Sequence, residues 1–173
     1  MQWQSRAATA ADVDALCALI FEHGANPWNH LPRAEVLAHL HGIGDGSTRA
    51  VLAEEEGRLL GFVSHVRTTW FHEYQPLGRQ DDAHAYVCEA VIHRGMAGRG
   101  LGSELLRQVV AAIHADGLDD IYIDRHEENA ASAGMMRKAG FVEISTYDDA
   151  ERRPNGSRRT TLCRWQTPVG QPG

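Results

Sequence analysis

The sequence predicts an α/β fold, in which the strands of one sheet alternate along the chain with helices. Short runs rich in apolar and β-branched residues, typical of strands, alternate with segments whose apolar residues recur at helical spacing. The clearest pair is the predicted strand Ala85–Ile92 and the segment from Leu101, where Leu101, Leu105 and Val109 share a helical face. At 173 residues the chain fits one domain with a sizeable core, and it contains no internal repeat.

The elements of the N-terminal half follow from local signals. A strand over Gln2–Ala7 leads into a helix for which Thr9 is the expected N-cap, supported by Asp12 three residues later. That helix places Cys17 on its apolar face, so we expect Cys17 in the core. A second helix over Arg33–His41 ends at a run of glycines. The segment between the helices, 24–32, either borders a substrate cleft or is anchored to the core by its tryptophan.

The remaining elements complete the sheet. Two strands flanking the hairpin loop 55–58 come next, and a polar loop at 72–82 precedes the central strand. A further helix over Asn129–Ala139 is stopped by Gly140. The other predicted strands are Arg49–Ala53, Leu59–Ser64, Asp119–Asp124, Phe141–Tyr147 and Arg159–Trp165. The domain is expected to span residues 1–166, and the Pro- and Gly-containing segment 167–173 is expected to be a flexible tail.

Composition excludes several classes of function. The formal net charge of −6 argues against a nucleic-acid partner, which would require a basic face. Three cysteines without CxxC spacing indicate neither a disulfide framework nor a zinc site. The start of the chain lacks the features of a signal peptide and no segment reaches membrane-spanning length, so we expect a cytoplasmic protein without a membrane partner. The ten histidines show no ligand spacing, and we expect no metal.

The glycine-dense turn between the central strand and its helix predicts an anion site. Glycines allow unusual backbone angles and close approach of a ligand, and the helix start offers unpaired N–H groups and a positive dipole end. A Walker loop is excluded because it needs a Gly-Lys pair and the chain's single lysine is Lys138. The dinucleotide fingerprint is excluded because its third glycine is missing. Arg94, Arg99, Arg107 and Arg137 could supply local positive charge.

The turn resembles the signature of the GNAT superfamily of acyl-CoA-dependent N-acyltransferases, Gln/Arg-x-x-Gly-x-Gly/Ala opening a helix. Gly100 and Gly102 match its glycines, while Ala97 stands where Gln or Arg is usual. A second motif, Asn-x-x-Ala ending in Gly-Phe, is matched by Asn129-x-x-Ser132 and Gly140-Phe141. The run His65–Trp70 and the segment Tyr86–Glu89 look like a branch that acetylates small amines and polyamines.

The resemblance covers nearly the whole chain and implies a twisted mixed sheet of about six to seven strands flanked by about four helices. It also implies acetyl-CoA as co-substrate. The residues expected to bind it are Val91, Ile92, Ala97, Gly98, Arg99, Gly100, Leu101, Gly102, Ser103, Asn129 and Ser132.

The chemistry of acyl transfer to an amine requires a base, because an alkylamine with a pKa near ~10 is protonated at neutral pH. Glu89 is the candidate, since it lies in an apolar strand where burial would raise its pKa. The resemblance implies a backbone N–H near Val91 or Ile92 as oxyanion donor, and a tyrosine that protonates the leaving thiolate. That position is Met136 here, so Tyr86, Tyr122 and Tyr147 are candidate substitutes, with water or the amine's own proton as alternatives.

The predicted function is acetyl transfer from acetyl-CoA to a primary amine of a small molecule by direct attack, with Glu89 and Tyr86 as catalytic residues. Two alternatives stay open: acetylation of a peptide N-terminus or protein lysine, and a non-catalytic acyl-CoA sensor. A homodimer is also open, because dimers are common in the family that the chain resembles.

Overall fold

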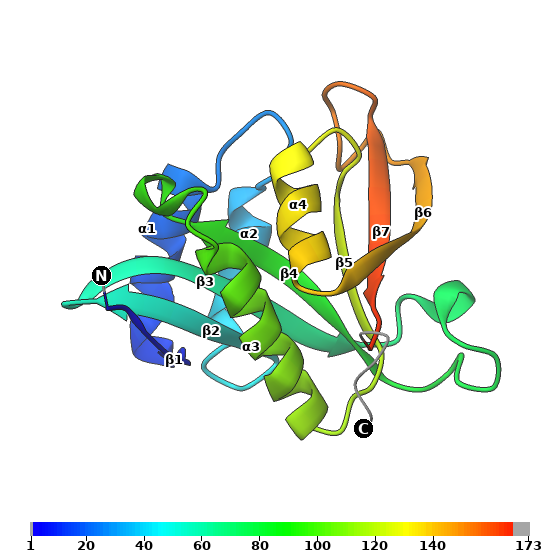
Figure 1. The fold of residues 1–173 in the computed structure, drawn as a ribbon, viewed down its shortest axis with the longest axis horizontal. Coiled ribbons are helices and arrows are strands. Elements are labelled where there is room, and N and C mark those ends of the chain that lie inside the picture. Colours follow the sequence, from blue (N-terminus) through cyan, green and yellow to red (C-terminus); the bar gives the residue numbers. More distant parts are fainter. Residues whose placement is uncertain (1, 168–173) are drawn as a thin grey trace.

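A computed structural model describes residues 2–167 and forms from them a seven-stranded mixed sheet with the strand order β1-β2-β3-β4-β5-β7-β6 (Figure 1). Neighbouring strands are antiparallel except β4 and β5, which are parallel. The strands are β1 Gln4–Ala7, β2 Thr48–Glu55, β3 Arg58–Thr68, β4 His84–Ile92, β5 Ile121–His126, β6 Phe141–Asp148 and β7 Arg159–Trp165. The α-helices are α1 Val13–His23, α2 Arg33–His41, α3 Leu101–Ala115 and α4 Ala130–Lys138.

The two faces of the sheet bury separate apolar cores. On one face α3 lies across the strands, and residues such as Leu105 and Val109 pack against Val63 and Val87 (Figure 1). On the other face α1 and α2 cover β2 and β3, with Leu16 and Ile20 packing against Phe62. Because helices cover both faces of the sheet, the central strands carry apolar side chains on each side. The α/β single domain expected from the sequence is therefore confirmed.

Element ends differ from the sequence prediction in a few places. Strand β3 continues to Thr68, four residues beyond the expected end, because its last residues still pair with β4. Strand β5 starts at Ile121 instead of Asp119, because its pairing with β4 begins there, although the Asp120 carbonyl still accepts the Ala85 N–H at 3.0 Å. The expected tail falls outside the described residues except for Thr167.

The first helix is entered through a short 3-10 turn, Ala10–Asp12. As predicted, the Asp12 carboxylate accepts a hydrogen bond from the backbone N–H of Thr9, the N-cap of this turn, at 2.7 Å. Cys17 is partly buried and packs against the α1–α2 core, close to the expectation for it. Among residues 2–167, no helix is long and apolar enough to cross a bilayer.

Candidate active site

The central strands β4 and β5 separate at their carboxyl ends and leave an opening in the sheet. Ala85–Val87 of β4 pair with Ile121–Ile123 of β5. Within residues 2–167, the two strands do not pair beyond these residues. A bulge opposite Ser64 and His65 inserts Cys88 into β4. The extra residue reverses the side-chain alternation, so that Val87 packs beneath α3 whereas Val91 packs beneath α1 and α2.

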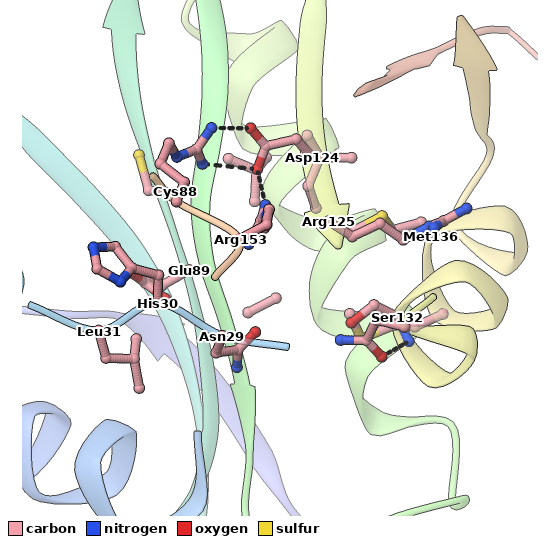
Figure 2. Close-up of a pocket in the computed structure, with 16 residues that line it drawn as sticks. Asn29, His30, Leu31, Cys88, Glu89, Asp124, Arg125, Ser132, Met136 and Arg153 are labelled. Atoms are coloured by element: carbon pink, nitrogen blue, oxygen red, sulfur yellow. Dashed lines mark hydrogen bonds and ion pairs between the residues drawn. The ribbon is translucent and has the colours of Figure 1, made fainter. Parts of the chain in front are cut away.

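The opening holds a cavity of about 110 Å³, called here the β4–β5 cavity (Figure 2). Its walls come from the α1–α2 loop, β4, β5, α4 and the β6–β7 loop. The lining residues are Asn29, His30, Leu31, Val87, Cys88, Glu89, Ala90, Ile123, Asp124, Arg125, Asn129, Ser132, Met135, Met136, Arg152 and Arg153. The cavity is thus polar, although it is cut into the apolar centre of the fold.

Glu89 contributes a half-buried carboxyl group to this cavity. Burial, assisted by the neighbouring Asp124 carboxylate, raises its pKa to about 7, while Arg152 and Arg153 oppose the rise. A carboxyl group with a pKa near neutrality is suited to exchange a proton at physiological pH. The structure therefore gives Glu89 the environment that the sequence predicted for a base.

Asp124 of β5 gathers an ionic cluster on the other side of the cavity. Its carboxylate accepts hydrogen bonds from Arg152 at 3.0 Å, from Arg153 at 3.2 Å and from the Tyr86 hydroxyl at 3.0 Å. Figure 2 shows the Arg153 and Asp124 side chains pointing toward each other. Arg153 is also fixed by Thr160, to whose hydroxyl its Nε donates at 2.9 Å. The cluster joins β5 to the β6–β7 loop.

The three candidate tyrosines lie outside the lining of the β4–β5 cavity. Tyr86 borders a neighbouring cavity of about 320 Å³ together with Trp70 and Phe71, called here the Trp70 cavity; it shares Asp124 and Arg152 with the β4–β5 cavity. Burial raises the pKa of Tyr86 well above its usual value, so its hydroxyl stays protonated. Tyr122 donates to Gln75 at 2.6 Å. Tyr147 packs against the cluster that Tyr86 and Tyr122 form with Leu162, and burial raises the pKa of Tyr147 to about 12.

Met136 lies at the wall of the β4–β5 cavity, on α4, and is 4% exposed (Figure 2). A thioether has no proton to donate. At this wall α4 therefore offers packing and no acid.

The glycine turn lines a second cavity, a groove of about 400 Å³ between α3 and α4. Gly98 and Gly100 have φ angles of +74° and +80°, and a Cβ added to either would meet nothing within 4 Å. Their surfaces are therefore open to a ligand, and the backbone angles favour glycine. Gly102 differs, because a Cβ there would lie 2.5 Å from Met135 Sδ. Gly102 allows α3 and α4 to approach, which the sequence did not reveal.

The structure brings most of the predicted co-substrate residues to the groove. Its lining includes Ile92, Ala97, Gly98, Gly100, Leu101, Gly102 and Ser103, and Ser132 from α4. Three predicted residues, Val91, Arg99 and Asn129, are not among those that line the groove, and Val91 is 4% exposed in the α1–α2 core. Asn129 lines the β4–β5 cavity, where its side chain accepts the Ser132 N–H at 3.1 Å and caps α4. Ser132 lines both cavities, so they adjoin at α4.

Sequence reasoning missed the ionic cluster. The sequence predicts Asp124 at the end of a strand, and Arg152 and Arg153 precede the Pro-Asn-Gly turn as ordinary loop residues. The alternation in this strand is a weak signal, because it places Asp124 with Asp120 and Tyr122 on the face opposite the apolar Ile121 and Ile123. The contact with the arginines spans nearly thirty residues of sequence and depends on the sheet order, which local patterns do not give.

Comparison with known proteins gives a family. The model of the acetyltransferase (GNAT) family matches residues 13–141, which is most of the chain and includes both the glycine turn and the β4–β5 cavity strands. Curated protein sequences gave no significant match.

Solved structures share the fold at low identity. NAA60 of Arabidopsis thaliana in complex with acetyl-CoA is 12% identical over 95% of this chain and 98% of that one, with a TM-score of 0.74. An N-acetyltransferase from Staphylococcus aureus Mu50 is 7% identical over 95% and 97%, with a TM-score of 0.71. AAC(6')-Ib in complex with parmomycin and acetyl-CoA is 16% identical over 95% and 93%, with a TM-score of 0.68.

The glycine-turn groove and the polar β4–β5 cavity thus adjoin beside the opening in the sheet. The chain belongs to the acetyltransferase (GNAT) family, and its class of activity is acetyl-CoA-dependent N-acetyl transfer.

Proposed function

We propose that this protein transfers the acetyl group of acetyl-CoA to a primary amine of a small molecule by direct attack, with Glu89 as the base. The observation that carries the choice of a small acceptor is a bridge between two loops, 24–32 and 149–158. Asn155 Nδ2 donates to the Pro27 carbonyl at 2.8 Å, and Arg153 Nη1 donates to the Trp28 carbonyl at 3.4 Å.

This loop bridge joins the two loops that form part of the wall of the β4–β5 cavity. Both loops lie at the same end of the sheet (Figure 1), and each contributes lining residues to the cavity. The Trp28 ring also lies 4.6 Å from the His126 ring, which fixes the α1–α2 loop to β5. A cavity of about 110 Å³ beneath such a bridge fits the end of a small molecule better than an extended peptide.

Co-substrate binding is assigned to the groove. Backbone N–H groups at the start of α3 and the open faces of Gly98 and Gly100 suit a pyrophosphate. Ala97, Leu101 and Ser103 line the same groove, although the Ser103 hydroxyl already donates to the Met135 carbonyl at 3.3 Å. The remaining predicted contacts are Ile92, Gly102 and Ser132, with Val91, Arg99 and Asn129 as more distant candidates.

In the proposed reaction, Glu89 takes a proton from the ammonium form of the acceptor, directly or through water. The nitrogen then forms a bond with the acetyl carbonyl carbon, and a backbone N–H of β4 near Val91 or Ile92 stabilises the oxyanion. That edge of β4 has lost β5 as its neighbour, which favours an available donor there. The C–S bond breaks as the intermediate collapses, the nitrogen loses its second proton to water or to the leaving group, and the CoA thiolate leaves and takes up a proton. Glu89 then returns its proton to solvent.

Tyr86 stays our candidate among the tyrosines for a role in that last step. Unlike Tyr122 and Tyr147, its hydroxyl is bonded to Asp124 and lies 3.2 Å from Arg152, both of which line the β4–β5 cavity. Because Tyr86 does not line that cavity itself, water is the competing proton source. A cytoplasmic location and a homodimer also remain predictions.

The experiment that tests the proposal is a thiol-release assay with acetyl-CoA, combined with mass spectrometry of the acceptors. The panel contains small primary amines, peptides with free N-termini and a lysine-containing protein. We expect acetylation of small amines and little of the others. Faster turnover of peptides or protein lysines would support the alternative acceptors. Acetyl-CoA binding without any acetylation would support a sensor.

A further inference from the structure

We infer that the acceptor carries a carboxylate close to its primary amine, as an α-amino acid does, and that Arg152 and Arg153 bind this carboxylate. The inference rests on the proposed function and narrows its acceptor. It starts from two arginines of the β4–β5 cavity, which line it beside Glu89 and Asp124 and keep N–H groups that no residue among 2–167 accepts.

The carboxylate of Asp124 is already fully engaged. Its Oδ1 accepts from the Tyr86 hydroxyl, from Arg152 Nη2 at 3.3 Å and from Arg153 Nη2, and its Oδ2 accepts from Arg152 Nη1. A carboxylate offers roughly four acceptor positions. Asp124 therefore has little capacity left for a second ammonium group of a polyamine, and it acts here as a support for the two arginines.

The arginines, in contrast, keep donors to spare. Arg153 makes one hydrogen bond from each nitrogen, and a guanidinium carries about five N–H groups. Arg152 bonds through its two Nη atoms, to Asp124, Tyr86 and Asp149, and its Nε has no acceptor among residues 2–167. Since both side chains line the cavity, the Nε–H of Arg152 and one further N–H on each Nη of Arg153 are left for an anionic ligand.

Exposure places Arg152 where a ligand would meet it. Its side chain is 44% exposed, whereas that of Arg153 is 8% exposed. Arg152 therefore faces the incoming acceptor, and Arg153 supports the cluster from below. Arg125, the third arginine, is engaged elsewhere, because it forms an ion pair with Glu143 and donates to the His126 and Glu127 carbonyls.

The neighbouring Trp70 cavity indicates where the rest of the acceptor lies. It shares Asp124 and Arg152 with the β4–β5 cavity and is otherwise bounded by Trp70, Phe71 and Tyr86. Trp70 is 69% exposed, its ring 5.9 Å from that of Tyr86. An amine near Glu89, a carboxylate at Arg152 and an apolar side chain against Trp70 describe an apolar α-amino acid.

The test compares matched acceptors in the thiol-release assay. Each of the apolar and aromatic L-amino acids is paired with its amide, which keeps the shape and loses the charge, and with the amine that lacks the carboxylate altogether. Spermidine represents the polyamines. We expect at least one amino acid to have a kcat/KM roughly 10- to 100-fold above its amide, the range for a charge-assisted hydrogen bond.

The Arg152→Gln variant should lose that preference, so that its kcat/KM for the amino acid falls to about its value for the amide, and Arg152→Lys should retain part of the preference. Arg159→Gln is the matched control, because Arg159 is 41% exposed and belongs to the same hairpin but does not line either cavity. Melting temperatures of the variants establish that they are folded.

Amides or amines that equal the amino acids would overturn the inference while leaving N-acetyl transfer intact. The inference would also be overturned if Arg152→Gln lowered kcat/KM equally for all acceptors. The same holds if no amino acid in the panel were acetylated although acetyl-CoA binds. Failure to bind acetyl-CoA, measured separately by calorimetry, would instead reject the proposed function.

Discussion

Glu89 shows how one inserted residue sets the chemistry of a side chain. The bulge at Cys88 reverses the alternation of β4, and Glu89 lies just beyond it, in the opening beside Asp124. Burial and that neighbouring carboxylate both disfavour the charged form, which raises the Glu89 pKa to about 7. The residue thus gains and loses its proton in the pH range of the reaction.

Replacement of Glu89 by Gln should lower turnover at neutral pH by roughly 10²- to 10⁴-fold, the usual contribution of a general base. Acetyl-CoA affinity should persist, and activity should recover toward wild type at alkaline pH as neutral amine becomes abundant. Wild-type turnover should rise with pH through about 7, as Glu89 ionises. Steady-state kinetics from pH 5.5 to about 9.5 measure both effects.

The stability of the same variant provides an independent check. Because the folded pKa is raised from 4.5 to about 7, the folded protein binds the Glu89 proton more tightly than the unfolded chain. The contribution of this group to stability is therefore lost as pH rises between these values, and Glu89→Gln should gain relative stability over that window. Glu22→Gln, at an exposed position, is the control. A Gln variant with normal turnover at neutral pH would refute the role as base.

Tyr86→Phe should lower turnover by roughly 10²-fold if this tyrosine assists departure of the thiolate, with unchanged acetyl-CoA affinity. Tyr122→Phe also removes a buried hydroxyl with a hydrogen bond, so it controls for the structural loss of about 1 kcal/mol. Tyr147→Phe completes the set. Near-normal kinetics in all three variants would assign the proton to solvent.

At the scale of elements, β4, its glycine turn and α3 form one continuous unit. The strand ends at Ile92, a 3-10 turn spans Arg94–Met96, and Gly100 is the N-cap of α3 in a left-handed conformation. Each step depends on residues adjacent in sequence. That locality explains why the turn and its helix could be predicted from the sequence.

Gly100→Ala should weaken acetyl-CoA binding by at least about tenfold, because the added methyl group projects from the open face of the turn. Gly117→Ala is the matched control. Its φ is +83° and its Cβ would also meet nothing within 4 Å, but it lies beyond the far end of α3. Both variants should lose about 1–2 kcal/mol of stability from the strained backbone. Calorimetry should show weaker acetyl-CoA binding for Gly100→Ala but not for Gly117→Ala. Equal acetyl-CoA affinities of the two variants would mean that the turn does not contact the co-substrate.

Other features of the elements could not be predicted, for physical reasons. The β4 bulge depends on pairing with β3, and the opening depends on how far β4 and β5 pair, so both are properties of the sheet. The role of Gly102 depends on Met135 of another helix. Arg152 and Arg153 lie in a loop whose sequence resembles any solvated turn, and their arrangement depends on Asp124 of β5.

At the scale of the whole molecule, the groove lies between α3 and α4, so a co-substrate bound there should stabilise the folded protein. A ligand held only by the folded state stabilises it by about 2.7 kcal/mol at a concentration of 100 times Kd. For a domain of this size we expect the melting temperature to rise by roughly 5–10 °C with saturating acetyl-CoA. Differential scanning fluorimetry measures the shift, with adenosine as the control ligand. An unmoved melting temperature would count against binding in the groove.

The loop bridge has a consequence for how this protein can diversify. Asn155 and Arg153 both recognise main-chain carbonyl groups, those of Pro27 and Trp28, and not their side chains. Substitutions in the α1–α2 loop can therefore accumulate over evolution while the bridge persists, provided that the loop keeps its path. The groove is built from a different part of the chain, residues 90–138. Descendants of this sequence could thus acquire new acceptors without losing the ability to bind the common donor.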